Sequence, residues 1–138
     1  MNPPSERGSV SAFAAGITVA LIVAAGLVID GGAMLAARRQ AVSDADAAAR
    51  AGAQMIDEDR LHADGRTVLD TEGSAAAARA FLASVGRRGE VSATPDQITV
   101  TVHVDQPMYV LGLAGIGTKT VTGRATARPV RGVNEGET

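Results

Sequence analysis

The chain has no cysteine and no tryptophan, and aromatic residues make up only 2% of its 138 residues. The lack of cysteine excludes disulfide bonds and thiolate metal sites, and it leaves the redox compartment open. Because large rings usually dominate buried cores, this core must be built from Val, Leu, Ile and Ala. A net charge of −2 also lacks the basic excess typical of nucleic-acid-binding proteins. The length suits one domain of ordinary size.

Charge is absent from one long segment near the N-terminus. Residues 8–29 contain no charged side chain, with Arg7 before them and Asp30 after them. A helix of this length spans about 33 Å, against about 30 Å of bilayer hydrocarbon. The sequence therefore predicts a transmembrane helix, 8–29, after a short tail, 1–7. A cleaved signal peptide is the alternative, although the apolar run exceeds the usual length of such a segment.

The helical pattern continues past the apolar run, without proline, over residues 30–56. Asp30, Gly31 and Gly32 predict a bend where the helix leaves the membrane. Small residues recur at every fourth position, a spacing that lets two helix backbones approach closely. Within the membrane we expect these residues to form a helix-packing seam: Gly8, Ala12, Gly16, Ala20 and Ala24. The spacing continues to Ala53, and an alanine-rich composition also produces it by chance.

The remaining chain is predicted to form a small α+β domain, 75–128, between an acidic linker, 57–74, and a disordered tail, 129–138. Its strand segments alternate, so that each has one apolar face and one polar face, as in a sheet packed on one side. The second helix, or the start of the long one, is the natural cover for the apolar face. The expected elements are a helix capped by Ser74, Ala75–Val85, and three antiparallel strands, Glu90–Thr94, Ile98–Asp105 and Lys119–Arg128.

An uncharged segment, Met108 to Gly117, lies between the last two expected strands. One interpretation is a short helix or loop packed under the edge of the sheet, which is the commoner arrangement. The other is an exposed patch that contacts the membrane surface or a partner subunit.

Residues suited to catalysis or metal binding are scarce. The two histidines, His62 and His103, lack a second ligand at metal-binding spacing apart from a nearby aspartate each. No nucleophile elbow, phosphate loop or dinucleotide motif is present. We therefore expect no enzyme activity, no cofactor and no small-molecule substrate. A hydrolase would require a site that combines His103 with Asp105 or Glu90.

The N-terminal third resembles the TadE/TadG-like proteins of the Flp, or tight-adherence, pilus system. The resemblance rests on Arg7-Gly8-Ser9 before the apolar run and on Val28-Ile29-Asp30-Gly31-Gly32 at its end. Two further matching stretches follow at the family's spacing, Ala36-Ala37-Arg38-Arg39-Gln40-Ala41 and Asp44-Ala45-Asp46-Ala47-Ala48-Ala49. The resemblance implies a pilin-like architecture with a cytoplasmic N-terminus and an extracytoplasmic C-terminal domain, an orientation that the positive-inside rule leaves open.

The implied function is that of a membrane-anchored pilus or secretion component, either a minor pilin-like subunit or an assembly factor. Its expected partners are membrane lipid and other pilus subunits, bound through helix packing, with no nucleic acid. Pilins of this class usually carry a glutamate at the fifth position after a cleaved glycine, whereas the fifth residue after Gly8 is Phe13. Prepilin processing and entry into a surface filament are therefore left open, and so is a secreted binding domain released by signal cleavage.

Overall fold

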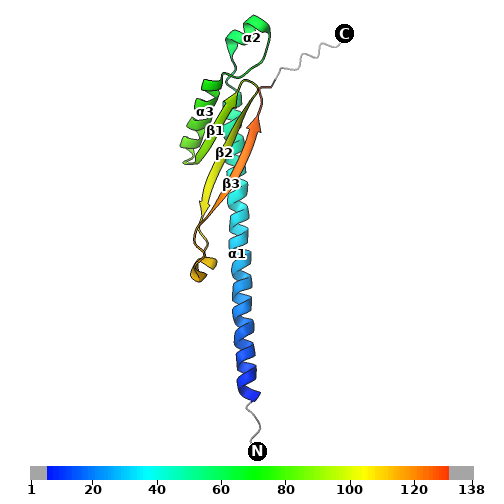
Figure 1. Ribbon diagram of the computed structural model, residues 1–138, viewed down its shortest axis with the longest axis vertical. Coiled ribbons are helices and arrows are strands. Elements are labelled where there is room, and N and C mark those ends of the chain that lie inside the picture. Colours follow the sequence, from blue (N-terminus) through cyan, green and yellow to red (C-terminus); the bar gives the residue numbers. More distant parts are fainter. Residues whose placement is uncertain (1–5, 131–138) are drawn as a thin grey trace, which may run out of the picture. The chain divides into compact units, whose positions relative to one another are not determined.

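The computed structural model describes residues 6–130, so most of the two predicted tails, 1–7 and 129–138, lies outside the described residues. Three α-helices, a short 3₁₀ helix and three strands follow one another in the order α1-α2-α3-β1-β2-η1-β3 (Figure 1). The chain divides into two compact units. The first combines α1 up to Leu35 with the segment Gln106–Lys119, and the second contains the sheet, α2, α3 and α1 from Ala36 onward.

Helix α1 is a single helix from Glu6 to Ala53, and it ends three residues before the predicted limit at residue 56. Alanine, leucine and other good helix formers fill it, and it contains no proline. The hydroxyl of Thr18 donates to the carbonyl of Ala14 at 2.9 Å, so this polar side chain is satisfied within the helix. Asp30, Gly31 and Gly32 are helical residues of α1, and the bend that we predicted there stays a prediction.

The sheet has the order β1-β2-β3, which confirms the predicted α+β class with three antiparallel strands. Strands β1 (Arg88–Thr94) and β2 (Gln97–Gln106) form a hairpin whose register places Val91 opposite Val100. Strand β3 (Lys119–Ala127) pairs with the other edge of β2. Side-chain hydrogen bonds across this pair run in the opposed order of antiparallel strands: Thr99 to Thr126, His103 to Thr122 and Asp105 to Thr120.

The core lies on the inner face of the sheet. Three β2 residues there, Ile98, Val100 and Val102, are fully buried. Small residues of the second half of α1, together with Ala78 and Leu82 of α3, pack against them: Ala41, Ala45, Ala48 and Ala49. The second helix thus covers the sheet as expected, but the long helix contributes its second half and not its start, which has an open surface. No large aromatic ring is fully buried among the described residues, in agreement with the aliphatic core predicted from composition.

Two glycines of the second unit allow the helices to come close to their neighbours. A Cβ at Gly123 of β3 would overlap the α1 backbone at Ala41 and Val42. A Cβ at Gly52 of α1 would overlap Ile98 and would lie 2.7 Å from the carbonyl oxygen of Ser74 on α3. The absence of a side chain at both positions thus sets how near α1 lies to the sheet and to α3.

The region predicted as a linker, 57–74, is more ordered than the sequence indicated. It contains helix α2 (Glu58–Asp64), capped by the carboxylate of Asp57. It also contains the start of α3 (Thr71–Ser84). Its apolar pair, Val68 and Leu69, is buried, and Leu69 forms a bridge with Ile56.

The predicted N-cap of the second helix, Ser74, is wrong. Asp70 caps α3 instead, because its carboxylate accepts the backbone N–H of Glu72 at 3.1 Å. Gly73 leaves room for that carboxylate and is itself a helical residue of α3. Ser74 is fully buried and donates its hydroxyl to the carbonyl of Met55.

Candidate functional site

The first candidate site is the apolar surface of α1 over residues 9–29. Helix α1 is long and apolar enough to span a membrane, and only 6% of its most hydrophobic window is buried. Large side chains around the helix are open, including Phe13, Leu21 and Val28, which are 65–75% exposed. An uncharged helix surface of this extent needs an apolar environment outside the folded chain.

The seam residues predicted within the membrane lie on this open surface. Ala12, Gly16, Ala20 and Ala24 are all exposed, and Gly8 lies near the start of α1. A Cβ built on Gly16 would meet nothing within 4 Å. Nothing in the described part of the first unit therefore occupies the seam at Gly16, and its role in packing against another helix stays a prediction.

Beyond the apolar run, small residues at the same four-residue spacing pack inside the folded chain. Ala37, Ala41, Ala45 and Ala49 are buried, and the last three belong to the core beneath the sheet. The spacing that lets two helices approach also lets a helix approach a sheet closely. Intramolecular packing within the second unit therefore explains this part of the pattern.

The second candidate site is centred on Asp30, the first charged residue after the apolar run. Its side chain is fully buried and accepts three backbone N–H groups of a segment about 80 residues later. The N–H of Tyr109 donates to Oδ1 at 2.9 Å, that of Val110 to Oδ2 at 3.0 Å, and that of Leu111 to Oδ2 at 2.7 Å. Asp30 thus holds the loop between β2 and β3, residues 107–118, against α1 within the first unit.

Apolar packing reinforces this attachment one helical turn before Asp30. Gly26 is buried, and a Cβ at this position would overlap the side chain of Val110. Met108 is also buried, at 7% exposure. The contact between Gly26 and Val110 places part of the loop beside residues of the apolar run itself.

Hydrogen bonding sets the charge state of Asp30, which lies directly after the predicted span. The N–H of Leu111 lowers the pKa of this carboxyl most, the N–H groups of Tyr109 and Val110 add to the effect, and burial opposes it. Because the folded pKa lies below its ordinary value of 3.8, the carboxylate stabilises the attached loop at every pH above that value. This contribution is lost only as the pH falls through the lower folded pKa.

The remaining loop residues form a compact turn with an apolar exterior. A 3₁₀ helix, η1 (Leu111–Ala114), ends at Gly115, whose φ of 85° requires glycine. Leu113 is 91% exposed and Tyr109 is 66% exposed. The segment is therefore a packed turn, as one interpretation expected, but its observed partner is α1 and not the edge of the sheet. Contact of its open side with a membrane or a partner subunit stays a prediction.

Residues of the hypothetical hydrolase lie on the outer face of the sheet. His103 Nδ1 lies 3.2 Å from the hydroxyl of Thr122. The carboxylate of Asp105 accepts hydrogen bonds from Thr120 at 2.6 Å and from Arg88 at 3.2 Å. His103 and Asp105 thus each have a hydrogen-bonding partner of their own on the strand surface. Within residues 6–130, no group of three or more His, Asp and Glu residues is placed to hold a metal ion.

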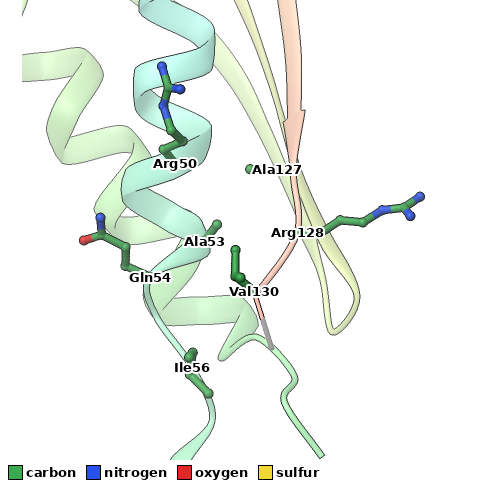
Figure 2. A pocket seen from close by; sticks show the side chains of 7 residues that line it. All are labelled: Arg50, Ala53, Gln54, Ile56, Ala127, Arg128 and Val130. Atoms are coloured by element: carbon green, nitrogen blue, oxygen red, sulfur yellow. The ribbon is translucent and has the colours of Figure 1, made fainter. Parts of the chain in front are cut away.

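An open hollow of about 420 Å³ lies in the second unit between the C-terminal end of α1 and the end of β3. Figure 2 shows Arg50, Gln54 and Ile56 on one side of it and Val130 on the other. The Arg128 side chain extends away from α1 in this view, and Arg50 forms an ion pair with Asp46. The hollow therefore lacks converging polar groups of the kind that fix a small ligand.

Part of the chain matches a known protein family. Residues 8–55 match the family Tad, described as "Putative Flp pilus-assembly TadE/G-like", which confirms the resemblance over the N-terminal third. The matched region contains the apolar run, Asp30 and the alanines of α1 that pack beneath the sheet. Over these residues the chain is similar to a Flp pilus-assembly family, and among the described residues one helix is long and apolar enough to span a membrane. Searches of curated proteins and of solved structures gave no match.

Proposed function

We propose that this chain is a single-pass, non-enzymatic membrane component of a Flp/Tad-type pilus or a related secretion apparatus. In this proposal residues 8–29 span the membrane, the N-terminus is cytoplasmic, and the domain containing the sheet is extracytoplasmic. The observation that carries the proposal is the open, uncharged surface of α1 over residues 9–29, inside the segment that matches the TadE/G-like family. Its role is that of a minor pilin-like subunit or an assembly factor.

Packing of α1 against the membrane helix of another pilus subunit provides the contact in this role. Gly16 and Ala20 are both exposed, and small residues at this spacing favour close approach of helices in lipid. Substitution by leucine would separate the two backbones, whereas leucine remains compatible with the bilayer.

Affinity purification from membranes tests this contact. Gly16→Leu and Ala20→Leu should each abolish recovery of partner subunits with the tagged chain, while leaving its membrane insertion intact. Ala25→Leu is the matched control, because residue 25 lies on the opposite side of the helix from residue 16 at about 100° per residue. Unchanged recovery after both seam substitutions would show that the seam does not bind the partners.

Shearing of cells that express a C-terminally tagged chain distinguishes the two roles. Tag in the sheared filaments would identify a minor pilin-like subunit, despite Phe13 at the fifth position after Gly8. Tag in the membrane fraction at the full, unprocessed mass would identify a stationary anchor or assembly factor. A shortened, soluble chain would instead identify a secreted domain released by signal cleavage and would refute the proposal.

A further inference from the structure

The loop between β2 and β3 has properties of a segment that lies in a membrane interface. Residues 108–117 contain no charged side chain, and the apolar Leu113 is 91% exposed. Ile116 and Tyr109 are also exposed, and Tyr109 is the only tyrosine of the chain. Tyrosine is enriched where membrane proteins cross the interface, because its ring is apolar and its hydroxyl is polar.

The attachment of the loop to α1 determines its depth. Val110 packs on Gly26, which lies one turn inside the apolar run, and the backbone from Tyr109 to Leu111 is bound to Asp30 just past the end of that run. If residues 8–29 span the bilayer, the loop lies at the end of the span and extends about one helical turn, near 5 Å, toward the hydrocarbon. Leu27 and Val28, which follow Gly26 in α1, are exposed as well.

The backbone of the loop is prepared for an environment with little water. Non-helical backbone at membrane depth is costly unless its polar groups are paired. Asp30 accepts the N–H groups of Tyr109, Val110 and Leu111. Three further amides are paired inside the loop: Leu113 N–H to Val110, Gly115 N–H to Gly112, and Ile116 N–H to Leu111. The same bonds solvate the carboxylate of Asp30 in place of water.

We propose that residues 107–118 form a second membrane contact, a loop that inserts Leu113 and Ile116 into the outer interfacial layer of lipid and is held there by Asp30. The inference rests on the proposed membrane span of α1. Its occupant is lipid, because the loop is uncharged and is bound to α1 at Gly26 and Asp30, at the end of the proposed span and within the same compact unit. The loop would fix the depth and rotation of α1 at the point where the chain leaves the bilayer.

Site-directed fluorescence tests the proposal in the full chain, which offers a clean background because it lacks cysteine. Leu113→Cys is labelled with an environment-sensitive dye after reconstitution into vesicles of phosphatidylcholine and phosphatidylglycerol. Leu61→Cys, an exposed leucine on the polar helix α2, is the matched control. Val19→Cys, inside the apolar run, reports independently whether α1 spans the bilayer. Nitroxide lipids and aqueous iodide are the two quenchers.

The proposal predicts that the Leu113 label is quenched by nitroxide placed near the lipid headgroup and is protected from iodide. The Leu61 label should show the opposite behaviour. In the background of Asp30→Ala, which releases the three backbone N–H groups, the Leu113 label should lose its protection from iodide while the Val19 label stays protected.

Two outcomes would overturn the proposal. Quenching of Leu113 by iodide, to the same degree as Leu61, would place the loop in water. Protection from iodide without quenching by nitroxide lipid would place a second copy of the chain over the loop instead. If the Val19 label is quenched by deep nitroxide lipid in either case, the proposed anchoring by α1 stands and only the loop contact is refuted.

Discussion

Replacement of Gly123 by alanine should measurably destabilise the domain that contains the sheet. The added Cβ would overlap three backbone atoms of α1, at Ala41 and Val42, and backbone cannot rotate away as a side chain can. Overpacking of a well-packed core costs about 1–3 kcal/mol. Replacing glycine by alanine also lowers the conformational entropy of the unfolded chain, which stabilises the folded state by about 0.4–1 kcal/mol. The overlap is the larger effect, and we expect a net loss of about 1–2 kcal/mol.

Thermal unfolding followed by far-ultraviolet circular dichroism, on the full chain in detergent micelles, is the assay. For a domain of this size, each kcal/mol lowers Tm by roughly 4–8 °C, so Gly123→Ala should lower Tm by about 4–16 °C. Gly117→Ala is the matched control, because a Cβ there meets nothing within 4 Å. Equal Tm values for Gly123→Ala and the wild-type chain would refute the close approach of β3 to α1.

The remaining predictions concern charged groups. Asp44→Ala should lower stability by about 1–2 kcal/mol, since it leaves Arg87 without the carboxylate that it meets at 2.7 Å; urea unfolding measures this loss. Arg50→Ala, which removes a largely exposed pair, should change the urea midpoint little. Hydrogen exchange should show constant protection of amides 109–111 from pH 7 to pH 5 and loss of protection only below 3.8, and loss already at pH 5 would contradict the lowered pKa of Asp30.

Periodicity was sufficient to predict the elements whose environment repeats along the chain. The apolar residues 8–29 predict a helix because no position on any face carries a charge. The strict alternation of Ile98, Val100 and Val102 with polar residues predicts β2, and all three are fully buried. Such patterns arise because a regular helix or strand keeps the same surroundings, lipid or core on one face, over many residues.

Local competition between caps explains the error at the start of α3. Ser74 and Asp70 are both residue types that favour the N-cap position, and Gly73, a weak helix former, lies between them. The helix begins at Thr71 because Ser74 finds its partner in Met55, far away in sequence, and Asp70 is left to cap the helix. Single-sequence patterns contain no information on such distant partners.

The role of Asp30 was missed for the same reason. Its position after the apolar run indicated a bend at a membrane boundary, and the segment 108–117 indicated a packed turn or an exposed patch, with nothing to connect the two. In the structure the loop packs on α1, so that the carboxylate of Asp30 binds the backbone of the uncharged segment. A buried carboxylate needs donors, and the loop contains backbone N–H groups that no strand pairs. A carboxylate at the end of an apolar span, followed later by an uncharged loop between strands, is the signal that could have suggested the contact.

The segment that matches the TadE/G-like family contains small residues in two different environments, one buried and one exposed. Ala45 and Ala49 are fully buried beneath the sheet, so this part of the match reflects folding of the chain. Gly16 and Ala20 are exposed, and folding of the described residues places no side chain over Gly16. A large residue at Ala45 should consequently act by unfolding the domain, whereas one at Gly16 should act by blocking association. Residues 9–29 are for this reason the part of the matched segment where binding to a partner helix is to be sought.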